Sequence, residues 1–186
     1  MERAVFKGAI LFTLMLVAGG CEHWIGPDRK GEIQLSSELF GTDSYYLFGY
    51  SYEDGEYYRY PYRGERIPDI INEAYRVIQG TDIVLLPGFN TPTQANGFAL
   101  VGELESLESA RNFFNEYLEV EPGLQFETVS DTVELYQVWV QKTSLDNYVK
   151  LLVKDIKTLE GEGGNLYCEV AMDFVYQPDG SGEFPD

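Results

Sequence analysis

Apolar side chains alternate with other residues near the end of the chain, and this pattern constrains the fold more than any other feature. The alternating row consists of Leu166, Cys168, Val170, Met172 and Phe174. Successive side chains of a strand point to opposite faces, so the row predicts a strand over 165–177 with one buried face. A strand over 148–159 and the turn 161–164 precede it, which predicts a long antiparallel hairpin. On the other face of this hairpin, Glu169 and Asp173 are expected to lie near lysines of the partner strand.

Shorter patterns extend the β-rich prediction along the chain. Further strands are expected over 32–35, 45–52, 57–62, 83–86, 98–101 and 134–143. Pro87-Gly88 is expected to end the strand over 83–86, and 69–78 fits a helix or a strand equally well. Ser106 is a suitable N-cap for an amphipathic helix over 107–119. These elements predict a mainly β (β-sandwich-like) or α+β fold, with antiparallel strands and one well-marked helix near residues 107–119.

Two tyrosine-rich segments form the most unusual part of the sequence. YYLFGYSY at 45–52 and YYRYPY at 57–62 flank a short polar stretch with a glycine, which predicts a β-hairpin. Tyrosine presents a broad rigid ring with a polar tip, and this suits sugar stacking and protein contacts. The hairpin is therefore the candidate binding surface, although aromatic residues also favour strands whose face is simply core. The candidate residues are Tyr46, Phe48, Tyr50, Tyr52, Tyr58, Tyr60 and Tyr62.

The length of the hairpin turn decides which of these side chains share a face. A three-residue turn with a left-handed Gly55 would pair Tyr46, Phe48 and Tyr50 with Tyr62, Tyr60 and Tyr58, and one face would be continuously aromatic. A two-residue Asp54-Gly55 turn would instead place Arg59 and Arg63 among Tyr46, Phe48, Tyr50 and Tyr52. That mixed face would suit a polar ligand, and both registers stay open at this stage.

The first residues have the architecture of a cleaved signal. Arg3 and Lys7 precede an apolar run over 9–17, and Ala18-Gly19-Gly20 leads to Cys21. This ending resembles a lipobox, which implies a palmitate-type lipid on Cys21 and predicts a lipid anchor in the membrane. The alternative is an ordinary secretory signal, with Cys21 free or paired with Cys168. We expect a signal peptide over 1–20, a lipidated tether over 21–31, a single globular domain over 32–177 and a loose tail over 178–186.

Charge and composition narrow the classes of function. The formal net charge is -18, with 13 Lys and Arg against 31 Asp and Glu. Nucleic acid is not expected as a partner, because no basic cluster is present to displace its counterions. An acidic surface is also repelled by anionic headgroups, so membrane attachment is expected to depend on the covalent anchor. The oligomeric state is not defined by the sequence.

The sequence lacks the residues that several kinds of catalysis require. His23 is the only histidine and lies in the expected tether, so a histidine-based dyad or triad has no base in the domain. Zinc, copper and non-haem iron favour His and Cys ligands, and the domain offers only Cys168. No EF-hand or phosphate-binding glycine loop is present either. We therefore expect no metal, no cofactor and no catalytic residue.

Besides a binding module, two other classes of function are possible for this sequence. Paired carboxylates alone can hydrolyse glycans, and Glu134, Glu169 and Asp173 are the residues to examine for that alternative. A structural component of an envelope complex would instead show an apolar patch or an unpaired strand edge.

Four short segments carry a resemblance to a known group of proteins. They are Pro68-Asp69-Ile70-Ile71, Gln137-Val138-Trp139, Tyr148-Val149-Lys150-Leu151 and Tyr176-Gln177-Pro178-Asp179-Gly180. Together they resemble small lipoproteins of Bacteroidetes-type bacteria. This resemblance implies a place in the cell envelope, at the outer membrane or the periplasmic face, and supplies no catalytic residue. The sequence thus predicts a lipid-anchored, non-enzymatic envelope protein that binds a glycan, a peptide or a partner protein.

Overall fold

The computed structural model describes residues 29–61, 66–93 and 97–185. The elements are, in chain order, β1 (Lys30–Ser36), β2 (Leu47–Ser51), β3 (Glu56–Tyr60), β4 (Ile71–Gln79), β5 (Asp82–Asn90), β6 (Phe98–Glu103), α1 (Leu107–Glu116), β7 (Gln137–Lys142), β8 (Tyr148–Glu160), the 3-10 turn η1 (Glu162–Gly164) and β9 (Leu166–Gln177). The fold is mainly antiparallel β with a single helix among the described residues, which confirms the predicted fold class.

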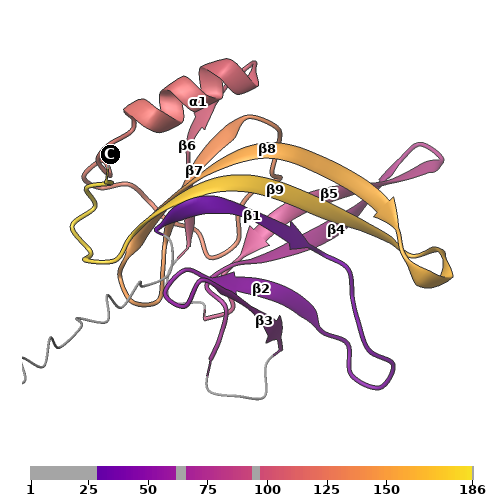
Figure 1. Ribbon diagram of the computed structural model, residues 1–186. Helices are drawn as coiled ribbons and strands as arrows, with labels where there is room; N and C mark the ends of the chain where they lie inside the picture. Colours follow the sequence, from indigo (N-terminus) through magenta and orange to yellow (C-terminus); the bar gives the residue numbers. More distant parts are fainter. Residues whose placement is uncertain (1–28, 62–65, 94–96, 186) are drawn as a thin grey trace, which may run out of the picture.

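Five strands form the main sheet, in the order β1-β9-β8-β7-β6 and antiparallel throughout. The predicted hairpin over 148–177 is its centre, and the long curved strands β8 and β9 dominate Figure 1. In the alternating row of β9, Cys168, Val170 and Met172 are fully buried, as predicted. Leu166 is the exception, because it lies at the exposed end of the hairpin and is 40% exposed.

Helix α1 covers one face of this sheet (Figure 1). Ser106 caps it in a reciprocal capping box, in which Ser106 accepts from the Ser109 backbone and Ser109 bonds back to Ser106. The buried Ala110 and Phe114 pack on sheet residues of β7 and β8 such as Val138. The helix starts where the sequence predicted and ends at Glu116, slightly before the predicted limit of 119.

Two hairpins, β2–β3 and β4–β5, pack on the opposite face of the sheet and complete a third layer. The core between them and the sheet is rich in aromatic side chains, and Phe89, Phe98 and Trp139 make ring contacts there. Gly49 of β2 lies close to the backbone at Ile70, where any Cβ would be obstructed. The tyrosine-rich hairpin is thus held firmly against the body of the protein.

The structure settles the ambiguous segment and corrects one boundary. Residues 69–78 do not form a helix, because strand β4 runs over Ile71–Gln79. Strand β5 continues to Asn90 instead of stopping at Pro87-Gly88, and Pro87 is paired with Ala74 of β4. A proline is tolerated there because β5 has a strand partner on one side only, and on its other side Pro87 takes part through its carbonyl, which accepts from the Val133 N–H at 2.9 Å.

The C-terminal segment, predicted as a loose tail over 178–186, is packed as far as it is described. The Phe184 side chain is buried against α1, and its backbone N–H donates to the Leu118 carbonyl at 2.8 Å. The Val120 N–H donates in turn to the Gly182 carbonyl at 2.9 Å. The expected tether also ends earlier than 31, because β1 begins at Lys30.

Candidate ligand-binding surface

Three aromatic rings and one arginine form a half-exposed cluster beside the β2–β3 hairpin. The rings of Phe40, Tyr46 and Phe48 contact one another, with centroids 5.6 to 5.8 Å apart. The Arg59 guanidinium lies 4.6 Å from the centroid of the Tyr46 ring, which is a cation–π distance. All three rings are partly exposed and Arg59 is exposed, so this aromatic cluster offers ring surface and a cation to solvent.

Backbone pairing fixes the cluster in place. Phe40 and Tyr46 exchange two backbone hydrogen bonds, of 2.8 and 3.0 Å, which close the loop between them. Tyr46 directly precedes β2, and Phe48 lies one residue inside that strand, so both rings are on the same face of it. The three rings therefore do not need to reorganise in order to present a common surface.

The hairpin register differs from both predicted alternatives. Ser51 pairs with Glu56, which leaves a four-residue turn over 52–55, and Gly55 has the left-handed φ of 68°. The observed turn is two residues longer than the predicted two-residue turn. Because this difference is even, the same side chains share each face as in that alternative, and Phe48 lies opposite Arg59. The face is accordingly mixed, as the two-residue alternative predicted, and not continuously aromatic.

The predicted binding residues that the structure describes separate into three groups. Tyr50 and Tyr52 are 7% and 1% exposed and belong to the core, so including them in a binding surface was wrong. Tyr58 and Tyr60 are half-buried and lie on the other face of the hairpin, opposite Gly49 and Leu47. Tyr46 and Phe48 remain at the surface. Tyr62, Arg63 and Cys21 lie outside the described residues.

A hollow of about 590 Å³ adjoins the aromatic cluster. It lies between the loop over 37–45 and the turn between β8 and β9, and Phe40 belongs both to its lining and to the cluster. Its polar lining includes Glu38, Arg76, Glu162, Asn165 and Tyr167. The ring of Tyr45, which is 64% exposed, also lines it. The sequence did not predict Phe40 or this hollow, because only the fold brings these distant segments together.

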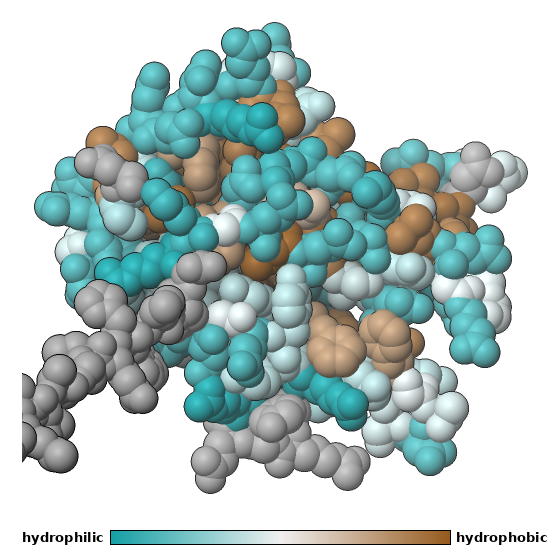
Figure 2. All heavy atoms as spheres, viewed as in Figure 1, coloured by the Kyte–Doolittle hydropathy of each residue, from teal (hydrophilic) through white to brown (hydrophobic). Residues whose placement is uncertain are grey.

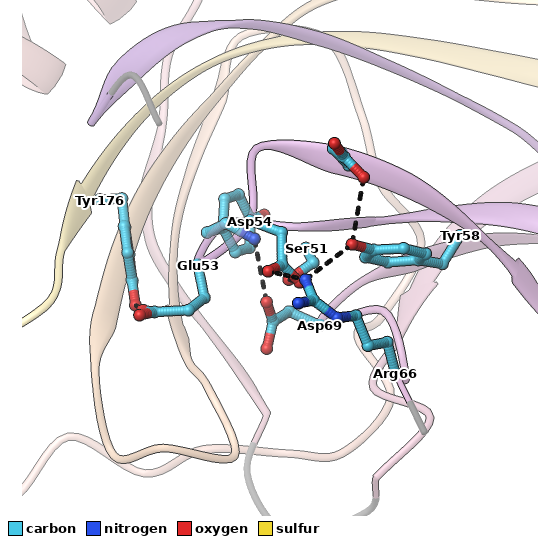
Figure 3. A network of polar contacts seen from close by, with 9 residues as sticks. Ser51, Glu53, Asp54, Tyr58, Arg66, Asp69 and Tyr176 are labelled. Atoms are coloured by element: carbon cyan, nitrogen blue, oxygen red, sulfur yellow. Dashed lines mark hydrogen bonds and ion pairs between the residues drawn. The ribbon is translucent and has the colours of Figure 1, made fainter. Parts of the chain in front are cut away.

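Polar groups hold the turn of the hairpin, as Figure 3 shows. Arg66 donates to the Asp54 carboxylate and, at 3.1 Å, to the Tyr58 hydroxyl. The Ser51 hydroxyl donates to Asp54 at 3.3 Å. The turn is thus tied to the segment that leads into β4, which limits movement of the strands that carry the aromatic cluster.

Asp69 is a buried carboxyl group at the same turn. Its Oδ2 accepts a hydrogen bond from the Tyr52 N–H at 3.0 Å, and its backbone carbonyl accepts from the Gln141 side chain at 2.6 Å. Burial raises the pKa of Asp69 to about 6, and the nearby charges of Asp54 and Glu53 act in the same direction. Asp69 therefore changes charge in a pH range where an ordinary aspartate stays ionised.

A second contact ties the turn to the main sheet. The Tyr176 hydroxyl donates to the Glu53 carboxylate at 2.7 Å and accepts from the Asn147 amide at 2.8 Å. Burial raises the pKa of Tyr176, and the acceptor Glu53 raises it further. The phenol therefore stays protonated and keeps donating to Glu53 over the physiological range.

The carboxylates considered for glycan hydrolysis are dispersed. Asp173 forms an ion pair with Lys154 at 2.6 Å, and Glu169 accepts from the Gln34 amide at 2.7 Å. Both are on β9 four residues apart, which is about 13 Å along a strand and more than the roughly 5 to 9.5 Å of glycosidase pairs. Glu134 is exposed in the segment before β7. This spacing does not favour a hydrolase that uses Glu169 and Asp173 as its catalytic pair.

Across residues 29–61, 66–93 and 97–185, no group of three or more His, Cys, Asp or Glu side chains is arranged to hold a metal ion. Comparisons with protein families, with curated proteins and with solved structures give no match to this chain.

Proposed function

We propose that the protein is a lipid-anchored, non-enzymatic envelope protein whose domain binds a glycan. The observation that carries this proposal is the aromatic cluster of Phe40, Tyr46, Phe48 and Arg59 beside the polar hollow at the loop over 37–45. The binding site consists of these two adjoining surfaces, with Phe40 shared between them.

A glycan suits this surface better than an apolar ligand does. The C–H face of a sugar ring stacks on an exposed aromatic ring, and its hydroxyl groups need donors and acceptors nearby. Tyr45 and Phe48 offer ring surface, while Glu38, Arg76 and Asn165 offer hydrogen-bonding groups in the hollow. The polar contacts at the turn of the β2–β3 hairpin hold the aromatic rings in place before binding, and this reduces the entropy lost on binding.

Binding to a glycan array, followed by titration calorimetry with the best glycan, tests the proposed ligand class. We expect Tyr45→Ala and Phe48→Ala each to weaken binding by about tenfold or more, because each removes one stacking ring. Tyr75→Ala is the matched control, since Tyr75 is a 41% exposed aromatic residue on the separate β4–β5 hairpin. Unchanged affinity in both Tyr45→Ala and Phe48→Ala, or binding to peptides alone on a parallel peptide array, would exclude this glycan site.

The lipid anchor is supported by the N-terminal sequence and by the position of the second cysteine. Cys168 is fully buried, and its thiol lies 3.8 Å from the Leu85 carbonyl within the core. A core thiol is poorly placed for a disulfide with Cys21, which leaves Cys21 available for acylation. Within the described residues, no helix has the length and apolar character of a bilayer span.

Mass spectrometry of the mature N-terminus tests the anchor directly. We expect a diacylglyceryl-modified Cys21 as the first residue in the membrane fraction, and loss of the membrane association in Cys21→Ser. An unmodified N-terminus in that fraction, or a disulfide between Cys21 and Cys168, would refute the anchor without affecting the glycan test.

A further inference from the structure

Helix α1 covers only part of its face of the sheet, and an open groove of about 630 Å³ lies beside it. The groove is lined by residues of α1, β1, β8 and β9, together with Leu118 after the helix and Pro185 of the C-terminal segment. On the face shown in Figure 2, brown apolar atoms are visible between the teal residues of the helix and those of the strands below it. This groove is on the side of the sheet away from the β2–β3 hairpin.

Basic side chains gather in this groove, although the chain is strongly acidic. Lys30, Arg111 and Lys150 line it, and the one carboxylate among its lining residues, Asp173, is bound by Lys154 at 2.6 Å. The chain has 13 Lys and Arg against 31 Asp and Glu, so a place with excess positive charge is unusual. We call this feature the cationic groove. Its charge is complementary to an anion.

Lys150 gives the groove a charge that is fixed in position. The residue is 3% exposed, and its Nζ donates to the carbonyls of Phe114 and Tyr117 at 2.8 and 2.9 Å. Nζ also lies 4.9 and 5.3 Å from the ring centroids of Phe114 and Phe184. The carbonyls at the C-terminal end of a helix attract a cation, so Lys150 both secures α1 and keeps an ammonium beneath the groove.

The remaining lining of the cationic groove is mostly apolar. Leu152 and Val175 form its floor on the sheet, and Phe114 and Leu118 form its wall on the helix side. Leu118 is 46% exposed, so apolar surface is open to solvent here. The size of the groove is within the range of small-molecule sites. Apolar surface with a cationic rim matches a ligand that has an apolar body and an anionic end.

We propose that the cationic groove binds an anionic amphiphile, with its apolar chain on Phe114, Leu118 and Val175 and its carboxylate or phosphate on Arg111. Arg111 is exposed on α1, and its planar guanidinium can bind either anion through two parallel hydrogen bonds. Lys30 and Lys150 add positive charge to the same site. This site is separate from the proposed glycan surface and does not depend on it.

Titration calorimetry with dodecanoate, below its micelle concentration, tests this site. The full chain carrying Cys21→Ser is used, so that no lipid on the chain competes for the groove. Dodecyl phosphate, dodecanol and acetate are the comparison ligands. We expect both dodecyl anions to bind, with the tighter of the two identifying the natural head group, and we expect dodecanol and acetate to bind at least about tenfold more weakly.

Two pairs of variants assign the binding to the groove. Arg111→Gln should weaken dodecanoate binding by about tenfold, whereas Lys157→Gln removes one positive charge at an exposed position outside the groove and should leave the affinity unchanged. Leu118→Asp should have a similar or larger effect through repulsion. Its control, Leu145→Asp, introduces the same group at a 61% exposed position outside the groove. Equal affinities for dodecanoate and dodecanol, or equal losses in Arg111→Gln and Lys157→Gln, would overturn the proposal.

Discussion

Asp69 links the stability of the fold to pH. Its pKa is about 6 in the folded protein and near 3.8 when the chain is unfolded, so over roughly pH 4 to 6 the folded state binds more protons. The free energy of unfolding therefore falls as the pH rises through this range. The charged form is the unfavourable one, because burial removes its hydration.

Asp69→Asn should remove this dependence. The side-chain oxygen of the substituted asparagine can still accept from the Tyr52 N–H, but the amide carries no charge at any pH. We expect the free energy of unfolding of the variant, minus that of the natural protein, to increase by about 1 to 3 kcal/mol between roughly pH 4 and 7. Urea denaturation at several pH values measures this difference. The exposed variant Asp43→Asn is the control, and a difference for Asp69→Asn that does not change with pH would contradict the assignment.

Gly49 is required by a close approach between β2 and the start of β4. A Cβ at this position would lie 2.5 Å from the Ile70 carbonyl oxygen and 2.7 Å from Pro68 Cβ, so the backbones would have to separate. We expect Gly49→Ala to lower the free energy of unfolding by about 1 to 3 kcal/mol, the usual cost of overpacking. Gly31→Ala is the control, because its Cβ meets only the edge of the Phe174 ring, at 3.2 Å. Equal stabilities in chemical denaturation would show that the hairpin is not tightly packed at Gly49.

At the scale of the elements, the end of the β4–β5 hairpin is apolar but contributes little to the core. Ile78 and Ile83 pair across the strands and are 77% and 56% exposed. Brown atoms over this hairpin are visible in Figure 2. We expect Ile78→Thr and Ile83→Thr each to change the free energy of unfolding by less than about 0.5 kcal/mol, since threonine keeps the branched Cβ that strands favour.

Ile71 of the same hairpin provides the contrast, because it is fully buried. Ile71→Thr places a hydroxyl group in the core, and we expect it to cost about 2 kcal/mol or more in the same denaturation experiment. A comparable loss from Ile78→Thr would mean that the hairpin end is covered in solution.

The sequence predicted the elements best where the side-chain period was long and regular. The row from Cys168 to Phe174 and the helix after Ser106 were predicted correctly, because periodicity and capping are local signals. The length of the β2–β3 turn and the end of β5 were harder to predict. Glu53 and Asp54 of the four-residue turn over 52–55 are bound by other elements, and Pro87 is accommodated in β5 because its carbonyl accepts from Val133, which is far away in the sequence. Neither of these tertiary contacts can be predicted from local sequence propensity.

At the scale of the whole molecule, the candidate surfaces could be predicted only in part. Tyr46 and Phe48 were recognisable from their strand, but Tyr50 and Tyr52 have the same spacing and are buried under Phe174 and Tyr176. All four side chains lie on the same face of the strand, and alternation does not show how far along that face the rest of the chain covers it. The cationic groove was not predicted, because Arg111, Lys150 and Lys30 are far apart in the sequence.

The C-terminal segment completes the layer that α1 begins, so its removal should affect the whole fold. Phe184 is 6% exposed, with its ring 6.3 Å from that of Tyr117 and 5.3 Å from Lys150 Nζ. We expect Phe184→Ala to lower the free energy of unfolding by about 2 to 4 kcal/mol, because it opens a cavity at the end of the helix and exposes the Lys150 contacts. Glu183→Ala, an exposed neighbour in the same segment, should have almost no effect. If thermal and urea denaturation gave the same stability for both variants, the last residues would not belong to the core, and α1 would depend on the sheet alone.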